Sequence, residues 1–414
     1  SVNDASTNAI DLSNVTTISS ATMSEMLEIV NNTGSIFTTA SNYAVNISNT
    51  ASATNINSVL GDTTGVVTAT VTTDTASNLN SALGSATATD VITITVSAGS
   101  AAASDLIALD NKTSVTIDAT AITTITGTGA QVATVATASG ISTSTNYLAT
   151  LSGTSTISDV NIVTGDTTGI VTAIVTADTA ANLNTGLSNA TASDALTLTV
   201  NGAIATAADL ISLDGKTSVA ISVTATAVSG LYADLTTVYV TNASSYTNLG
   251  DENVTITDTQ SATNVNTILN KTSGIVTATV SADTAANLNT NLVNATATDA
   301  LSLTVTDTNL SSLTNLLALD AKTSVVVNAS NITAISETYA NLNTAYSSAG
   351  ITGLGNEAVT ITDTQSATNV NTIANKTSGA VTATVTSGAV TATLGALTNV
   401  DANDVITFTT NDTS

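Results

Sequence analysis

The basic side chains of this sequence all occur in one short motif. Its five lysines stand in Asn-Lys-Thr-Ser, Gly-Lys-Thr-Ser or Ala-Lys-Thr-Ser, at Lys112, Lys216, Lys271, Lys322 and Lys376. The version at 215–218 resembles the end of a phosphate-binding loop, but that loop needs a glycine where this chain has Leu210. A structural interpretation is better: each lysine follows a short helix, near its negative end, beside Asp110, Asp214 or Asp320 in three of the copies.

Aspartates recur in the same pattern. One set immediately precedes a predicted strand, at Asp90, Asp194, Asp299 and Asp404. Turn and capping chemistry accounts for these residues, because a carboxylate readily accepts hydrogen bonds from backbone N–H groups. Oxygen-rich turns could also hold calcium. The sequence contains neither an EF-hand loop nor the glycine-rich nonapeptide of calcium-binding β-rolls, so it predicts no definite cofactor and leaves calcium open.

The composition excludes several classes of chemistry. The 414 residues include no histidine, cysteine or arginine, so Ser-His-Asp and Cys-His triads and zinc sites with histidine or thiolate ligands cannot be built. A net charge of −25 makes nucleic acid an unfavourable partner. No stretch is apolar enough for a membrane span. A polysaccharide lyase would need a charged groove formed by long loops, which the sequence does not indicate, so we predict no enzyme activity.

Pairs of threonines with Thr-x-Thr spacing are the most regular surface feature, because this spacing places both side chains on one face of a strand. The pairs are Thr68 and Thr70, Thr93 and Thr95, Thr197 and Thr199, Thr255 and Thr257, Thr277 and Thr279, Thr360 and Thr362, Thr382 and Thr384, and Thr407 and Thr409. Such ranks resemble the ice-binding faces of antifreeze solenoids, and they indicate ice, glycan or mineral binding as an alternative function. Threonine is, however, a common solvent-facing strand residue, and Ile174 and Val326 interrupt the ranks.

Long-range repetition organises the whole chain. Val67, Val171, Val276 and Val381 recur at intervals of 104 or 105 residues, each two positions after a glycine, Gly65, Gly169, Gly274 or Gly379. These glycines stand where a small or left-handed residue is needed. We divide the chain into a partial repeat at 1–44, repeat 1 at 45–148, repeat 2 at 149–253, repeat 3 at 254–358 and a partial repeat 4 at 359–414.

Each repeat contains four similar elements. In the third copy, residues 301–305 alternate apolar and hydroxyl side chains, which predicts a strand, and residues 284–292 have the spacing of a short helix. Such an element cannot fold alone, but stacked copies can cover one another. We therefore predict one continuous solenoid over 1–414: a right-handed parallel β-solenoid with short helices on one wall, in about sixteen coils of roughly 21 to 34 residues. The absence of proline agrees with this prediction.

The motif DTAANLNTxL…ATATDALxLTV resembles repeats of very long Thr-, Ala-, Val- and Asn-rich cell-surface proteins of bacteria, especially marine cyanobacteria. The resemblance covers essentially the whole chain. It implies a β-solenoid and a secreted, S-layer, adhesive or filament-forming role, with calcium in some members. It defines no ligand residues.

From these observations we expect an acidic, extracellular structural protein of a cell-surface layer, fibre or adhesin stalk. Both ends of the sequence fall within a repeat, so we expect either a longer native chain or copies that join end to end. Lateral self-association is a further expectation. The tyrosines near Tyr43, Tyr147, Tyr246 and Tyr346 recur once per repeat and are interpreted as lateral contact points.

Overall fold

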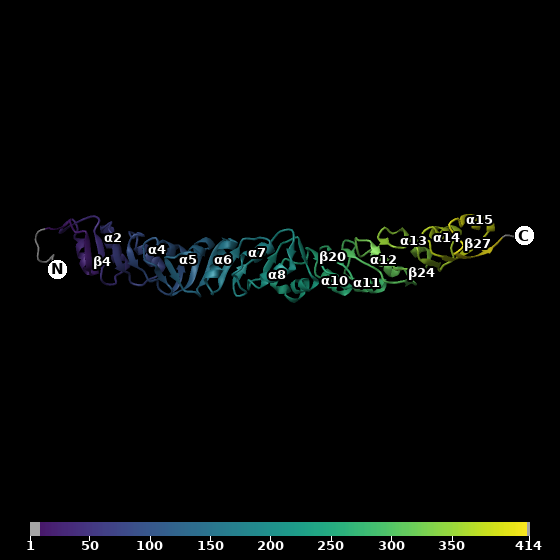
Figure 1. Cartoon of the computed structure of the whole chain (residues 1–414), viewed down its shortest axis with the longest axis horizontal. Helices are drawn as coiled ribbons and strands as arrows, with labels where there is room; N and C mark the ends of the chain where they lie inside the picture. Colours follow the sequence, from purple (N-terminus) through teal and green to yellow (C-terminus); the bar gives the residue numbers. More distant parts are fainter. Residues whose placement is uncertain (1–8, 412–414) are drawn as a thin grey trace. The chain divides into compact units, whose positions relative to one another are not determined.

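The computed structural model describes residues 9–411, in which short strands and short helices alternate along the chain (Figure 1). These residues form two compact units. Unit 1 comprises the described residues up to Val200 together with Ser212–Ser222, and unit 2 comprises Asn201–Ile211 together with the described residues from Val223 onward. The helices of unit 1 are α1 (Met23–Asn31), α2 (Ala53–Asp62), α3 (Ala76–Ala82), α4 (Ala103–Asp110), α5 (Gly129–Thr137), α6 (Ile157–Asp166) and α7 (Ala180–Gly186).

The remaining helices continue the alternation. They are α8 (Ala207–Asp214), α9 (Tyr232–Thr236), α10 (Ala262–Leu269), α11 (Ala285–Asn291), α12 (Thr314–Asp320), α13 (Tyr339–Ser347), α14 (Ala367–Ala374) and α15 (Val390–Ala396), with a π-helical turn, η2 (Thr237–Thr241), and a 3₁₀ turn, η3 (Ala243–Ser245). Most begin at a threonine or serine whose hydroxyl accepts a hydrogen bond from the third helical residue. In α11, the Thr284 hydroxyl accepts from the Asn287 N–H at 3.2 Å, and Asp283 accepts from the Asn287 side chain at 2.9 Å.

The strands pair in parallel, and four sheets of four or five strands form what we call the main sheets. In unit 1 these are β2 (Thr17–Ala21), β4 (Ala44–Ile47), β5 (Val67–Thr70) and β6 (Val91–Thr93), then β7 (Gly99–Ala102), β9 (Ile122–Thr128), β11 (Leu148–Ser155), β12 (Val171–Val175) and β13 (Ala195–Thr197). In unit 2 they are β15 (Ala205–Thr206), β17 (Ala227–Gly230), β19 (Asn253–Ile256), β20 (Val276–Thr279) and β21 (Ala300–Ser302), then β22 (Asn309–Leu310), β24 (Ala334–Glu337), β26 (Ala358–Ile361), β27 (Val381–Gly388) and β28 (Val405–Thr410).

The other strands have two or three residues each and lie outside the main sheets. They are β1 (Ile10–Leu12), β3 (Phe37–Thr39), β8 (Ile117–Ala119), β10 (Ile141–Thr143), β14 (Thr199–Val200), β16 (Ile221–Val223), β18 (Tyr246–Thr247), β23 (Val327–Asn328) and β25 (Ile351–Thr352). Of these, β1 pairs with β3, β8 with β10, and β23 with β25, each pair in parallel register.

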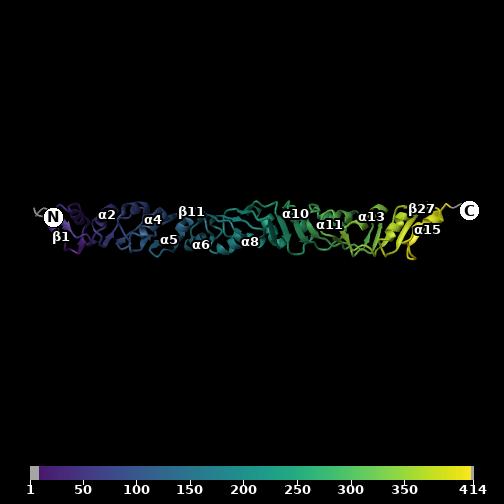
Figure 2. The same cartoon turned by 90° about the horizontal axis from the view of Figure 1, so that it is seen from above.

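The core of each unit lies between the inward side chains of the main strands and the helices. In unit 2, Leu288 of α11 and Leu292, which caps its end, are fully buried with Leu301 of β21. In unit 1, successive helices from α1 to α7 pack on one another; α4, α5 and α6 lie side by side in both views (Figures 1 and 2). Stacked elements therefore bury the apolar surface that one element of about 25 residues could not cover alone.

The predicted right-handed parallel β-solenoid was wrong. The described residues form an α/β fold in which fifteen helices accompany separate parallel sheets of two to five strands, rather than a single solenoid with short helices on one wall. The physical reason lies in the third element of each repeat. The sequence around 91–96 alternates as one strand, but β6 ends at Thr93, and the N–H of Val96 donates to Asp118 O in β8 at 2.8 Å. Since these backbone groups pair away from the main sheet, that sheet stops at β6.

Candidate functional site

The aspartates that precede strands are structural hydrogen-bond acceptors; Asp90, Asp194 and Asp299 are buried and Asp404 is half-buried. Asp299 is 3% exposed; one carboxylate oxygen accepts from the Val276 N–H at 2.8 Å, 23 residues earlier, and the other from the Thr296 N–H at 2.8 Å and its hydroxyl at 3.0 Å. Asp90 and Asp194 repeat these contacts, and Asp404 accepts from the Val381 N–H at 2.6 Å. The prediction of turn chemistry is thus confirmed for these aspartates, which also join neighbouring strands.

In three of its copies, at Lys112, Lys216 and Lys322, the Lys-Thr-Ser motif contacts the backbone of the preceding element, and we call this arrangement the Lys-Thr-Ser clasp. Lys322 donates from Nζ to Asn289 O at 2.9 Å and Leu292 O at 2.7 Å, at the C-terminal end of α11. The Thr323 hydroxyl donates to Leu301 O at 2.8 Å and accepts from its N–H at 3.0 Å, while Ser324 donates to Asp299 O at 2.9 Å.

The clasp changes the interpretation of the lysines. Lys112 and Lys216 likewise donate to Leu83 O and Leu187 O, so the three lysines stabilise the negative ends of α3, α7 and α11, each one element earlier than the helix that the lysine directly follows. Partial burial lowers the pKa of Lys112 and Lys322. In the Gly-Lys-Thr-Ser version, the Thr217 hydroxyl donates to Leu196 O at 2.7 Å and is buried, which is incompatible with a phosphate loop.

Four tyrosines donate hydrogen bonds to carboxylates inside the fold. The Tyr43 hydroxyl donates to Asp62 at 2.5 Å and that of Tyr147 to Asp166 at 2.8 Å; in unit 2, Tyr239 donates to Glu252 and Tyr346 to Glu357. Tyr43 and Tyr147 are 1% exposed and Tyr246 is also buried. The prediction that the recurring tyrosines form lateral contacts was therefore wrong for these three.

Alkaline pH is expected to destabilise the protein through these tyrosines. Burial, and then the bond to a carboxylate, raise the pKa of Tyr43, Tyr147, Tyr239 and Tyr346 above the ordinary value of 10.0. Because the folded state prefers the protonated phenol, the stabilisation is fully present below pH 10 and is lost as pH rises through the folded pKa. Each tyrosine should reduce the free energy of unfolding by about 1.4 kcal/mol per pH unit above pH 10.

The measurement is the melting temperature by circular dichroism between pH 8 and 12, together with phenolate absorbance. The double variant Tyr43→Phe and Tyr147→Phe should show a shallower alkaline decline than the wild-type chain, and a lower melting temperature at pH 8. A loss of phenolate absorbance near pH 10 in the folded double variant, relative to the folded wild-type chain, would contradict the expectation, because it would show that Tyr43 and Tyr147 ionise at the ordinary pKa.

The predicted threonine ranks are exposed or half-buried at every position, but they are interrupted. Neighbours that lie side by side are Thr70 and Thr93, Thr255 and Thr277, Thr360 and Thr382, and Thr384 and Thr407. Two members leave the main sheets: Thr95 bridges to Asp118, and Thr199 belongs to β14. Thr257 and Thr362 follow the ends of β19 and β26, while Thr68, Thr197, Thr279 and the rest lie on main strands.

One row in each repeat ends on an apolar residue in the third strand, whereas Thr70 and Thr384 still face Thr93 and Thr407 there. Thr172 of β12 pairs with Ala195 of β13, Thr277 of β20 with Ala300 of β21, and Thr382 of β27 with Val405 of β28. The rows are therefore only two or three hydroxyl side chains wide within a sheet.

Sequence reasoning missed a set of asparagines that join successive helices. The side-chain oxygen of Asn161 in α6 accepts from the Asn189 N–H at 2.9 Å, and Asn57, Asn266 and Asn371 do the same for the residue 28 positions later. Their equal spacing within the repeat was a signal that could have revealed them.

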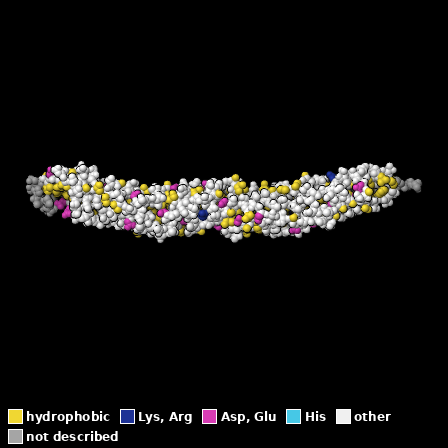
Figure 3. Space-filling model, in the orientation of Figure 1, with side chains coloured by type: hydrophobic (Ala, Val, Ile, Leu, Met, Phe, Trp, Pro, Cys, Tyr) yellow, Lys and Arg dark blue, Asp and Glu magenta, His cyan; other side chains and the backbone are white. Residues whose placement is uncertain are grey.

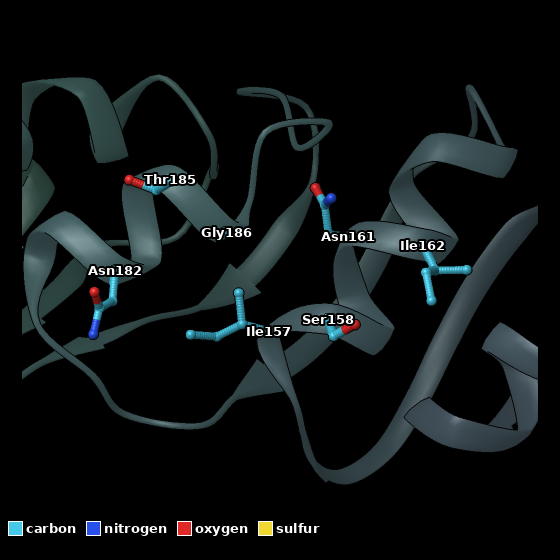
Figure 4. A pocket seen from close by; sticks show the side chains of 7 residues that line it. All are labelled: Ile157, Ser158, Asn161, Ile162, Asn182, Thr185 and Gly186. Atoms are coloured by element: carbon cyan, nitrogen blue, oxygen red, sulfur yellow. The ribbon is translucent and has the colours of Figure 1, made fainter.

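No group of three or more acidic residues that could hold a metal ion occurs among residues 9–411. A shallow hollow lies between α6 and α7, lined by Ile157, Ser158, Asn161, Ile162, Asn182, Thr185 and Gly186. Figure 4 shows Ile157 reaching toward the helix of Asn182 and Gly186. A Cβ on Gly186 would lie 2.4 Å from Ile157 Cγ2, so this glycine permits close packing of the two helices.

Comparison of the chain with protein-family models, with curated proteins and with solved structures gave no match. Within the described part of the chain, no helix combines the length and apolar character that crossing a membrane requires.

Proposed function

We propose that the chain is an extracellular structural repeat protein that forms part of a cell-surface layer, fibre or adhesin stalk, and that it is not an enzyme. One observation carries the proposal: the polar side chains that recur in every repeat direct their hydrogen bonds to the backbone of a neighbouring element. The Lys-Thr-Ser clasp and the buried aspartates bond to backbone groups in this way. The tyrosine hydroxyls bond to carboxylates within the fold. A repeated framework of this kind suits mechanical continuity along a chain.

The acidic surface also supports an extracellular structural role. A net charge of −25 keeps a chain of 42% hydrophobic residues soluble at high local concentration. We also propose end-to-end assembly. Strand β28 is the last strand of its sheet and pairs with β27 along one edge. Its other edge offers backbone groups with which a strand of another copy could pair.

External protease treatment of intact cells that produce the protein tests the proposal. We expect the chain to be digested before the cells lyse, while a cytoplasmic marker protein stays intact. Electron microscopy of the untreated cells should place an antibody to the chain on a surface layer or fibre. Protection from protease until lysis would contradict the proposal.

A second candidate function is binding to ice, glycan or mineral, and the exposed threonine pairs in register favour it. Their narrow rows weigh against a large crystalline target. Thermal hysteresis or ice shaping by the purified chain, absent from the variant Thr277→Lys, would support this candidate over the structural role.

A further inference from the structure

Charged residues are almost absent from the main sheets. Among their strands within residues 9–411, the one charged residue is Glu337 of β24, whose side chain is buried. The acidic residues instead lie on helices and turns or in the side strands, such as Asp118 of β8. On the face drawn in Figure 3, charged side chains are few and scattered. The outward face of each main sheet is therefore uncharged on a chain of charge −25.

The outward face of β11 and β12 in unit 1 is also apolar. Leu148, Ile170 and Ile174 are 45%, 46% and 51% exposed, and they flank the exposed Thr150 and Thr172, which lie side by side. We call these five residues the apolar strand face. The corresponding residues of repeat 1 are Ala44, Asn46, Val66, Thr68 and Thr70; Thr68 matches Thr172, and the other four are smaller or more polar, so the cluster is particular to repeat 2.

We propose that the apolar strand face of one chain packs against the same face of a second copy, a lateral contact that rests on the structural role proposed above. Two sheets pack face to face about 10 Å apart, with the side chains of the two facing surfaces interdigitating. The contact would bury the exposed surface of three large apolar side chains, Leu148, Ile170 and Ile174.

Electrostatics favours this orientation over others. Two copies of a chain with charge −25 repel each other wherever acidic helices or turns face one another. Because exposed charges more than about 8 Å apart are largely screened at physiological salt, an approach through uncharged strands avoids most of this repulsion. The face therefore suits a partner that is equally uncharged there, which a second copy supplies.

A carbohydrate partner fits this face less well. Sugar rings commonly stack on aromatic side chains, and strands β11 and β12 contain none. The described tyrosines of unit 1, Tyr43 and Tyr147, are buried beneath the surface.

The area that the two sheets bury determines the expected affinity of the contact. One five-stranded sheet offers roughly 300 Å² to a partner, from a strand spacing of about 4.8 Å and about 3.3 Å per residue. A stable interface buries about 800 Å² per partner, so this contact alone should be weak, with a dissociation constant on the order of 100 μM. Uncharged strands in other repeats could add to it by multivalency.

Sedimentation velocity of the full chain at roughly 5 to 500 μM in 0.15 M salt tests the contact. The sedimentation coefficient should rise with concentration, and 0.5 M salt should not weaken the association. Thr172→Asp and Thr172→Lys should each weaken it at least tenfold, because either charge would be buried without a partner. Thr54→Asp, which places the same charge on the exposed first turn of α2, should leave it unchanged. Circular dichroism checks that each variant is folded.

Three results would overturn the proposal. One is a single species across the concentration range; another is equal association of Thr172→Asp and the wild-type chain. The third is a monomer that binds cellulose or chitin particles and loses that binding in Thr172→Lys, which would assign the face to a carbohydrate. Protease accessibility on cells is independent of these results, so a surface-exposed monomer would refute the contact and leave the structural role standing.

Discussion

Replacing Gly169 by alanine should lower the melting temperature of the protein by about 6 to 12 °C, the equivalent of about 3 kcal/mol for a folding unit near 200 residues. A Cβ on Gly169 would lie 2.2 Å from Tyr147 O and 2.7 Å from Tyr147 C, closer than any real Cβ contact. The obstacle is backbone of the neighbouring strand segment, which cannot rotate away as a side chain can. Relief therefore requires β11 and β12 to separate locally.

Gly84→Ala is the matched control in the same unit. No atom lies within 4 Å of the position that its Cβ would take, so the variant should have an unchanged or slightly higher melting temperature. Thermal unfolding followed by circular dichroism compares the two. Equal melting temperatures for Gly169→Ala and Gly84→Ala would show that the strands do not approach as closely as the structure has them.

This glycine shows how far sequence reasoning could go. The repeated glycines predicted positions that need either a small residue or a left-handed backbone; they are Gly65, Gly169, Gly274 and Gly379. The structure shows that small size is the requirement. At all four, a Cβ would lie 2.2 or 2.3 Å from a backbone oxygen, and none of the four has a positive φ. A sequence pattern identifies a constrained position more readily than it identifies the atom that imposes the constraint.

The lysines illustrate a limit of a different kind. A local interpretation considered Asp320, two residues from Lys322, but Nζ reaches carbonyls 30 and 33 residues earlier. Such contacts depend on which element stacks on which, and that order follows from the fold. The helix at 284–292 was predicted correctly, as α11 spans Ala285–Asn291, because its cap and apolar spacing are local.

Internal variation between repeats held information that periodicity alone did not reveal. Tyr43 and Tyr147 are replaced at the corresponding positions by Glu252 and Glu357. Their acceptors Asp62 and Asp166 become Lys271 and Lys376 in the same two repeats. In unit 2 the glutamates instead accept from tyrosines of a preceding helical segment, Tyr239 and Tyr346. Positions that change together in this way mark a contact, here one between a strand start and the end of the following helix.

The break of each main sheet could not be read from the sequence. Residues 91–96 and 300–305 alternate without interruption, yet the strands end at Thr93 and Ser302. In both repeats the following N–H groups pair with a side strand, since Val305 donates to Asn328 O at 2.9 Å. The backbone groups of the main sheet and those of the side strand are chemically equivalent partners for these N–H groups. Only the three-dimensional arrangement determines which of the two they pair with.

Replacing Asp299 by asparagine should lower the free energy of unfolding by about 2 to 3 kcal/mol, because a buried donor left without an acceptor costs about 1 to 3 kcal/mol. The carboxylate accepts from two backbone N–H groups, one on each oxygen, at 2.8 Å. Asparagine keeps the shape but presents an NH₂ group where one acceptor was, so either Val276 or Thr296 loses its partner. The buried site, 3% exposed, gives water little access to replace the lost bond.

Asp251→Asn removes the same charge from an exposed position in the same unit and should change the stability by less than about 0.5 kcal/mol. Urea denaturation measures both variants, and hydrogen exchange of the Val276 amide adds a local readout. In Asp299→Asn, this amide should exchange faster even under conditions in which most of the chain stays folded, because the bond that joins β20 to the next strand is weakened there first. If the Val276 amide exchanged equally slowly in Asp299→Asn and in the wild-type chain, the carboxylate would not join these strands. The interpretation that the recurring aspartates link neighbouring elements would then be wrong.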